Sequence, residues 1–402
     1  MVRTLFNNIS PGECEFFKVV RGKALKDKIQ KLLSEAKVDL ALITDEANMR
    51  YLSGFSGEGY LLLAKEGGKV VTDSRYTIAA KQESPDFEVI DWGKIGYYKP
   101  AMDTVKDKQI KSVGYEDLYL TVAEFKQFEK KIKRYAALKP LGGRADELRQ
   151  IKDQAEINCI AEAEAIGDRA FARLMLDLGV DASELGEVGS EVAKYHVATS
   201  MEALKTTEKQ VAARLEFYLK DEGGERLSFD TIAASGLNGA KPHAVPEDKL
   251  LKNGELLTLD FGCIYKGYCS DMTRTVAIGK PSAELTKIYN IVKKAQETAL
   301  QEIKPGMTGK EIDALARDVI KKEGYAKNFG HSLGHSVGLK IHEKPGFSPK
   351  EKTVIKPGMV VSVEPGIYVE NFGGVRIEDL ISVTDNGINN LSRSVKGLIL
   401  IR

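Results

Sequence analysis

The chain has 402 residues, of which 43% are apolar and 29% are charged, and this composition is typical of a folded globular protein of two or three domains. Its 59 Lys and Arg residues balance 58 Asp and Glu residues, which leaves a net charge of +1. Without a strong charge of one sign, neither nucleic acid nor an anionic membrane is expected as the main partner. No apolar run is long enough for a membrane span, and the first residues lack the apolar core of a signal peptide. The four cysteines are scattered and form no CxxC pair, which predicts reduced thiols in a cytoplasmic protein.

The first part of the chain alternates between helical and strand-like patterns. Residues 24–36 carry apolar side chains at helical spacing. Residues 38–44, 59–64 and 68–74 follow as short apolar runs of strand length. This alternation predicts an α/β domain.

A change of pattern follows at residues 138–146, where Pro140, Gly142 and Gly143 come close together. Proline and glycine interrupt regular structure, so we place a domain boundary there, with one domain over residues 1–143 and a second over 144–402. A long helical stretch begins shortly after this boundary.

The second part contains an internal repeat. Residues 207–223 align without gaps on residues 308–324, and each copy begins with the Thr-x-x-Gln or Thr-x-x-Glu pattern of a helix capping box. Both copies have helical apolar spacing and end at a glycine. We interpret the pair as a duplicated half-domain.

Between the two copies, residues 255–279 read as two strands joined by a Lys-Gly turn. Tyr265 should then oppose Tyr268, and the same register sets Asp260 and Asp271 on one face of the ribbon. The register also places Cys263 and Cys269 on opposite faces, which argues against a disulfide between them.

Two further carboxylates lie in similar apolar surroundings. Glu364 ends the run "GMVVSVE", and Glu378 lies in "GGVRIEDLISV" with Arg376 on the same face. Each of these acids alone could be an edge-strand charge that faces water. A group of four buried carboxylates, however, requires cations. Together with one imidazole, four carboxylates suit a pair of divalent transition-metal ions.

The motifs "LDFG", "SDMTRT", "GHSLGHSVGLKIHE", "VEPGIY" and "VRIED" occur in this order, and here the chain resembles the methionine aminopeptidase, prolidase and creatinase family. The resemblance implies an α+β catalytic domain of the pita-bread fold, with an internal pseudo-twofold repeat. The front of the chain, with "NMRYLSGFSGEGYLLL", is similar to the creatinase/prolidase-type N-terminal domain. "PHAVP" at 242–246 matches the branch of the family that acts on Xaa-Pro bonds.

The resemblance implies five metal ligands, with Asp271 and Glu378 as the bridges between two ions: Asp260, Asp271, His335, Glu364 and Glu378. Glu364 is also the expected proton shuttle. Manganese is the expected ion, and cobalt, zinc and iron suit the same ligands.

The resemblance also implies roles for residues that bind no metal. His243 and His342 should contact the substrate, and His331 should be a further catalytic-site histidine. Arg376 should steady the carboxylates. Trp92, the only tryptophan, reads most simply as a half-buried packing residue, but it could also cover the proline of the substrate.

The implied activity is hydrolysis of the N-terminal bond in peptides with proline at the second position, by an Xaa-Pro aminopeptidase. The alternative is an Xaa-Pro dipeptidase, or prolidase, and a homodimer is expected in either case. A metal-free creatinase-like hydrolase and a non-enzymatic pita-bread binding module are the rivals, but both usually lack some of the five ligands.

The chain departs from the family pattern at residues 180–205, which are additional to the usual length. This segment reads as a helix after a glycine-containing approach, and it could be a subunit contact, a lid or a neutral surface appendage. His196 lies outside every motif, and we expect it at the surface.

Overall fold

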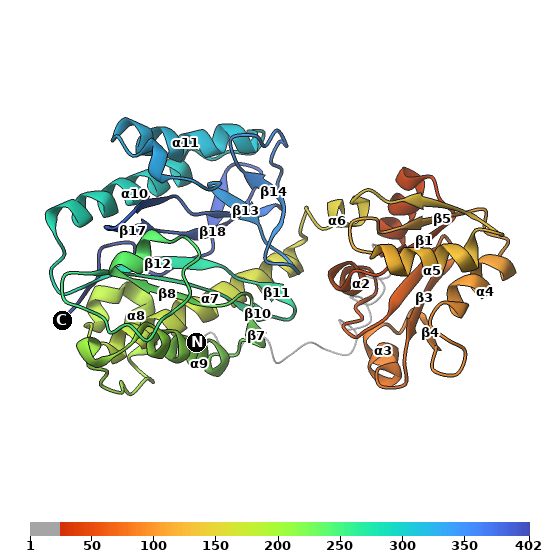
Figure 1. Cartoon of the computed structure of the whole chain (residues 1–402), viewed down its shortest axis with the longest axis horizontal. Helices are drawn as coiled ribbons and strands as arrows, with labels where there is room; N and C mark the ends of the chain where they lie inside the picture. Colours follow the sequence, from red (N-terminus) through yellow and green to blue (C-terminus); the bar gives the residue numbers. More distant parts are fainter. Residues whose placement is uncertain (1–24) are drawn as a thin grey trace. The chain divides into compact units, whose positions relative to one another are not determined.

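The computed structural model describes residues 25–402, and the chain divides into two compact units between Arg149 and Gln150 (Figure 1). The sequence places this boundary after Gly143, six residues before the observed division. The difference arises because the proline- and glycine-containing stretch forms regular structure. Strand β6 (Ala137–Pro140) and helix α6 (Arg144–Glu147) both belong to the first unit. The N-terminal stretch, where no signal peptide is expected, and Cys14 lie outside the described residues.

The first unit is built on a six-stranded mixed sheet in the order β4-β3-β2-β1-β5-β6. Its other strands are β1 (Leu40–Ile43), β2 (Tyr60–Ala64), β3 (Gly67–Thr72), β4 (Glu88–Asp91) and β5 (Ser112–Tyr115). The helices are residues 25–36, α2 (Glu46–Ser53), α3 (Thr77–Glu83), α4 (Lys99–Asp107) and α5 (Val122–Ile132). The predicted α/β layout is therefore confirmed. Pro140 is tolerated because β6 is an edge strand.

The second unit places long helices over two main sheets (Figure 1). The helices are α7 (Gln154–Asp177), α9 (Glu208–Asp221), α10 (Ala283–Glu302) and α11 (Gly309–Lys322). One sheet has the order β20-β12-β9-β8, with β8 (Ile232–Ser235), β9 (Leu256–Phe261), β12 (Met272–Ile278) and β20 (Leu400–Ile401). The other has the order β14-β13-β15-β18-β19, with β13 (Gly334–Ser336), β14 (Glu343–Phe347), β15 (Val360–Val363), β18 (Asp379–Val383) and β19 (Ile388–Asn390).

Short strands complete the second unit: β7 (Arg226–Leu227), β10 (Cys263–Tyr265), β11 (Tyr268–Cys269), β16 (Gly366–Val369) and β17 (Gly373–Arg376). Two apolar cores hold it together. One packs α7 and α9 against β9 and β12, and the other packs α10 and α11 against β15 and β18. Within residues 25–402, no helix combines the length and the apolar character that a membrane crossing requires.

The internal repeat is a structural repeat. Helices α9 and α11 each have 14 residues, and each starts at a complete capping box, from Thr207 or Thr308. Each capping threonine also forms an isolated antiparallel bridge to a returning chain, Thr207 to Leu250 and Thr308 to Val354. The two halves expected of the pita-bread fold are therefore present.

The additional segment 180–205 consists of short helical pieces rather than one helix. These are η1 (Ala182–Leu185), α8 (Gly186–Val192) and η2 (Ala203–Lys205). Leu185, Val192 and Ala203 are buried in the core that α7 and α9 share. The segment is thus part of the packed unit, and the reading as a separable appendage does not hold.

The expectation that His196 lies at the surface is wrong. Its side chain is only 4% exposed. Arg173 Nε donates to His196 Nδ1 at 3.2 Å, so the other ring nitrogen carries the proton and donates to Asp177 at 2.9 Å. These bonds connect the additional segment to the end of α7. No sequence pattern around His196 predicts this contact.

Candidate active site

The site begins with the ribbon that carries two aspartates. Tyr265 opposes Tyr268 and Thr273 opposes Asp260, so the predicted register is confirmed over both ladders. Asp271 directly precedes β12, two residues before Thr273, and it therefore shares a face with Asp260. Side-chain alternation along two paired strands thus brings two carboxylates together.

Three further ligand candidates come from the other half of the unit. His335 lies on β13, Glu364 follows β15, and Glu378 lies between β17 and β18. His335 Nε2 is 3.3 Å from an oxygen of Asp271 and 3.5 Å from an oxygen of Glu364. Ligand atoms of Asp271, His335 and Glu378 all lie within 4.8 Å of one another. Asp260 is close enough to raise the pKa of Asp271, and it also pairs with Arg376 at 2.7 Å.

The tautomer of His335 suits metal binding. Its Nδ1 lies 3.3 Å from the carbonyl oxygen of Ser336, and a carbonyl only accepts, so Nδ1 carries the proton. Nε2 then directs its lone pair at the carboxylates. A histidine ligand oriented by a backbone carbonyl in this way is common in metal sites.

The carboxylates repel one another in this buried position. Burial raises the pKa of Asp271 and of Glu378 well above their usual values, and the neighbouring carboxylates raise both further. Burial also raises the pKa of Glu364, although His335 and Arg376 oppose the effect. Among the described residues, Asp260 Oδ1 and Glu378 Oε1 are buried without a hydrogen-bond partner. Divalent cations would satisfy both oxygens and neutralise the charge, so these residues fit a metal pair.

Arg376 connects the candidate ligands to their surroundings through four hydrogen bonds. It is 4% exposed, and its guanidinium donates to Asp260 at 2.7 Å, to Thr273 Oγ1 at 3.0 Å and to the Tyr368 hydroxyl oxygen at 2.7 Å. It also donates to the carbonyl oxygen of Pro242 at 3.2 Å. This geometry agrees with the steadying role expected of Arg376.

Tyr368 continues this chain of bonds to His331. His331 Nδ1 donates to the carbonyl oxygen of Ser332 at 2.8 Å, which leaves Nε2 as an acceptor 3.0 Å from the Tyr368 hydroxyl. Burial lowers the pKa of His331 to about 4, so the ring is neutral at pH 7. His331 therefore reaches the candidate ligands only through Tyr368 and Arg376.

The other two histidines lie beside the ligands with exposed side chains. The ring of His342 is 4.4 Å from that of His335. Burial lowers the pKa of His342, and His335 and His243 lower it further by repulsion. His243 likewise lowers the pKa of His331. His243 is therefore close enough to interact electrostatically with both His331 and His342. Both His243 and His342 are more exposed than the ligands, as contact with a substrate requires.

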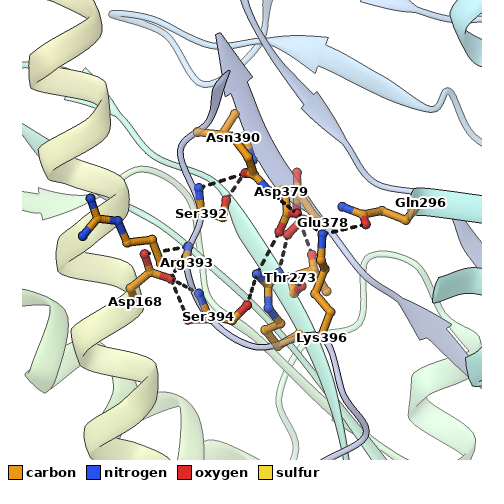
Figure 2. Close-up of polar contacts among 12 residues, drawn as sticks. Asp168, Thr273, Gln296, Glu378, Asp379, Asn390, Ser392, Arg393, Ser394 and Lys396 are labelled. Carbon is orange, nitrogen blue, oxygen red and sulfur yellow. Dashed lines mark hydrogen bonds and ion pairs between the residues drawn. The ribbon is translucent and has the colours of Figure 1, made fainter. Parts of the chain in front are cut away.

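A second network lies behind the ligands. Thr273 Oγ1 donates to Glu378 Oε2 at 2.8 Å, and Arg274 donates to the carbonyl oxygen of Glu378 and to Asp379 Oδ1. Lys396 donates to the other oxygen of Asp379 at 2.6 Å. Figure 2 shows these contacts around Asp379 and Glu378.

The same network reaches α7 through the chain that follows β19. Asp168 of α7 accepts from the backbone N–H of Arg393 and of Ser394 and from the Ser394 hydroxyl (Figure 2). Ser394 in turn offers its carbonyl oxygen to Arg274 at 2.9 Å. Segment 392–396 thereby joins α7 to the strands that carry the candidate ligands.

Trp92 lies in the first unit, between β4 and α4. Its ring packs edge-on against Tyr97 with the centroids 4.9 Å apart, and the side chain is half-buried. The structure therefore describes a packing contact for Trp92, and its contact with a substrate stays a prediction.

Sequence reasoning missed Tyr368, Arg274 and Asp168. Tyr368 could have been found, because Gly366 opposes Arg376 in the β16–β17 hairpin and residues two apart share a face. Tyr368 then falls on the face of Arg376. No comparable signal points to Asp168, since its partners lie far away along the chain.

The comparisons with known proteins agree with this geometry. The model for "Metallopeptidase family M24" matches residues 158–385, and that for "Creatinase/Prolidase N-terminal domain" matches residues 26–151. The chain is 35% identical to the Xaa-Pro dipeptidase of Pyrococcus horikoshii over 92% of this chain and 97% of that protein.

Solved structures give the same result. An Xaa-Pro dipeptidase from Bacillus anthracis is 39% identical, with a TM-score of 0.84 and coverage of 94% of this chain and 99% of that one. An X-Pro aminopeptidase from Thermotoga maritima is 34% identical, with a TM-score of 0.81 and coverage of 92% and 99%. This chain therefore belongs to metallopeptidase family M24, with a creatinase/prolidase-type N-terminal domain before a pita-bread catalytic domain.

Proposed function

We propose that the protein is an Xaa-Pro dipeptidase that uses two divalent metal ions, held by Asp260, Asp271, His335, Glu364 and Glu378. The observation that supports this most directly is the meeting of Asp271, His335 and Glu378 from both halves of the unit. Buried oxygens that lack a partner within residues 25–402, on Asp260 and Glu378, support it further.

Ions bound there would supply Lewis acidity and make water a better nucleophile at neutral pH. The chain's own residues would do the rest. Asp271 and Glu378 are the candidate bridging ligands, and Arg376 keeps Asp260 in place. Glu364 would take a proton from the attacking water, and this role is supported by its place beside His335 and by the bond that it accepts from the Ser362 hydroxyl.

The substrate would meet the exposed histidines. His243 and His342 are the candidate donors to the scissile carbonyl and to the residue after the cut, where they would hold the bound peptide equally before and during the reaction and so act on KM. His331 would act through Tyr368 rather than by touching the substrate. Trp92 remains a proposed cover for the proline ring.

The choice between dipeptidase and aminopeptidase reverses the preference drawn from the sequence. Relatives named Xaa-Pro dipeptidase, from two Pyrococcus species, each match over at least 92% of this chain. The Thermotoga maritima X-Pro aminopeptidase is a close structural neighbour as well, so the aminopeptidase is the second candidate. We further propose that the ion is manganese, that the protein forms a homodimer and that it acts in the cytoplasm.

A substrate comparison tests the proposal. The manganese-loaded protein should hydrolyse a dipeptide with proline second, such as Ala-Pro, and should be far slower on Ala-Ala and on the tripeptide Ala-Pro-Ala. Exhaustive chelation should abolish the activity, and added Mn²⁺ should restore it. Faster cleavage of Ala-Pro-Ala would favour the aminopeptidase, and full activity without detectable metal would end the metal hypothesis.

A further inference from the structure

Glu208, the first residue of α9, is a fully buried carboxylate that takes no part in the candidate metal site. It accepts four hydrogen bonds. Oε1 accepts from the Ser235 N–H at 2.7 Å and from the Ser235 hydroxyl at 2.8 Å. Oε2 accepts from Asn238 Nδ2 at 3.0 Å and from the Glu247 N–H at 3.1 Å. Both oxygens are therefore fully used.

The direction of the bond between the Ser235 hydroxyl and Glu208 is fixed by a neighbouring cation. Lys249 Nζ donates to Ser235 Oγ at 2.6 Å. Because an ammonium group has no acceptor, the Ser235 hydroxyl receives this bond and its own proton points to Glu208. A carboxylate is thus the group that this pocket of donors requires.

The donors lie at the two ends of one segment, residues 235–247, which includes His243. Ser235 and Asn238 belong to its start and Glu247 to its end. In the middle, Arg376 donates to the carbonyl oxygen of Pro242. Glu208 therefore holds the two ends of the loop that contains His243. Arg376, which also pairs with Asp260, holds the centre of the same loop.

The other half of the unit shows what is special about Glu208. In both halves the first two N–H groups of the helix dock a returning chain, by the same pattern: Glu208 to Lys249, Lys209 to Glu247, Gly309 to Thr353 and Lys310 to Glu351. The residue that corresponds to Glu208 is Gly309. A Cβ atom on Gly309 would lie 2.4 Å from the carbonyl oxygen of Gly346, so no side chain fits there.

The chain that presents His342 is fastened in a different way. Lys152 Nζ lies 3.0 Å from Glu343 Oε2, and both side chains are buried. The two halves thus dock their returning chains in the same way but hold the histidine-bearing segments differently. A buried carboxylate holds the His243 loop, and a buried ion pair lies next to His342.

We propose that Glu208 is a positioning residue that sets substrate affinity by fixing the His243 loop. The kinetic part of this proposal rests on the proposed function, because it needs Ala-Pro as a substrate. The structural part, the fixing of the loop, can be measured without a substrate. The candidate metal ligands do not contact Glu208, so loss of its bonds should change KM much more than metal content or kcat.

The test compares Glu208→Gln with Thr207→Ala. The glutamine has the same size, but its amide presents two N–H groups where the loop needs an acceptor. We expect KM for Ala-Pro to rise roughly threefold to tenfold, with kcat within about twofold and metal content unchanged. Thr207→Ala removes the helix cap next door and should lower the melting temperature without changing KM.

Amide hydrogen exchange supplies a readout that needs no substrate. Glu208→Gln should accelerate exchange in residues 236–247 and leave residues 346–353 unchanged. Asn238→Ala removes one of the four donors to Glu208, together with the acceptor for Lys241 Nζ. It should change KM and exchange in the same direction, and it stands in if Glu208→Gln does not fold.

Unchanged KM and unchanged exchange in a folded variant would overturn the proposal, and so would an equal rise of KM in Thr207→Ala. If the wild-type protein does not cleave Ala-Pro while the exchange result holds, the proposed function fails and the positioning role of Glu208 stands.

Discussion

At the scale of single residues, Asp271 is a buried carboxylate that calls for a cation. It is buried beside three other carboxylates, Asp260, Glu364 and Glu164, and each of them raises its pKa. Its backbone N–H donates to Glu164 of α7 at 3.3 Å, which ties this part of the ribbon to that helix.

Asp271→Asn should therefore remove the ability to hold two ions. A neutral amide cannot bridge two cations, so we expect metal content to fall from two ions to one or none and kcat to fall at least about 100-fold. Elemental analysis and Ala-Pro hydrolysis check this. Asp260→Asn is the matched comparison and should be milder, since Asp260 is not one of the two proposed bridging ligands. Two ions and near-normal turnover in Asp271→Asn would show that Asp271 is no bridge.

Trp92 allows a second test at this scale, since all tryptophan emission comes from one side chain. If it covers the proline ring, a bound Xaa-Pro product should shift the emission, and Trp92→Ala should raise KM more than it lowers kcat. If the Tyr97 contact is its whole role, emission should not respond to saturating product and KM should stay the same. Fluorescence titration and steady-state kinetics decide between the two.

At the scale of elements, segment 392–396 is a brace behind the candidate ligands. It connects α7 at Asp168 with Arg274 and Asp379, and Arg274 holds the backbone of Glu378 (Figure 2). Groups that orient metal ligands commonly change metal affinity by 10- to 100-fold when they are removed.

Asp168→Asn should accordingly weaken Mn²⁺ binding by roughly tenfold or more, because the amide opposes two backbone N–H donors. Isothermal titration of the metal-free protein measures this directly. Arg169→Met is the control, since the neighbouring Arg169 pairs with Glu222 and not with the brace. Lower stability with unchanged Mn²⁺ affinity would leave Asp168 a purely structural role.

The additional segment 180–205 makes a separate prediction about stability. Leu185 is 3% exposed and packs in the α7–α9 core, whereas Val197 of the same segment is 86% exposed. Leu185→Ala should cost about 2–5 kcal/mol, and Val197→Ala should stay within about 0.5 kcal/mol. Urea unfolding of both variants checks this. Equal, small effects would mean that the segment is only loosely attached.

Local pattern explains which elements could be predicted. The β9–β12 register follows from a two-residue turn, and α9 and α11 follow from capping boxes and apolar spacing, because these signals lie within one element or one hairpin. The four candidate carboxylates stand out because carboxylates in apolar strands are rare, whereas the choice of His335 follows from the resemblance to the family. The brace and Glu208 could not, since their partners come from distant segments that only the folded chain brings together. The pattern in 180–205 predicts one helix where the chain forms short helical pieces, because no glycine or proline in the sequence marks the end of α8 at Val192.

At the scale of the whole molecule, the two units can be observed separately. Trp92 lies in the first unit and the candidate metal ligands lie in the second, so tryptophan emission reports unfolding of the first unit alone. This separation makes the pH response of the first unit measurable.

Glu116 should give the first unit a pH-dependent stability. It is 3% exposed, and burial raises its pKa from 4.5 to about 7 despite bonds from the backbone of Thr44 and Asp45. A raised pKa in the folded state contributes stability that is present below about pH 4.5 and lost as the pH rises through 7. The loss should be at most about 3 kcal/mol between pH 5 and 8.

Denaturant unfolding followed by Trp92 emission at pH 5 and pH 8 checks this prediction. Glu116→Gln should flatten the dependence, because the amide does not ionise. Glu66→Gln, which changes an exposed acid in the turn between β2 and β3, should leave it unaltered. A wild-type first unit that is equally stable at both pH values would contradict the assignment.

The matched docking at α9 and α11 also bears on the history of the molecule. Two helices of one length, with one cap and one pattern of docking, indicate descent from a single ancestral unit. The first copy now contributes Asp260 and Asp271, and the second contributes His335, Glu364 and Glu378. A lone ancestral unit would have owned only part of this set, so it would have had to assemble with a twin to enclose the same site. The difference between Glu208 and Gly309 shows that two copies joined in one chain need not fasten their loops in the same way.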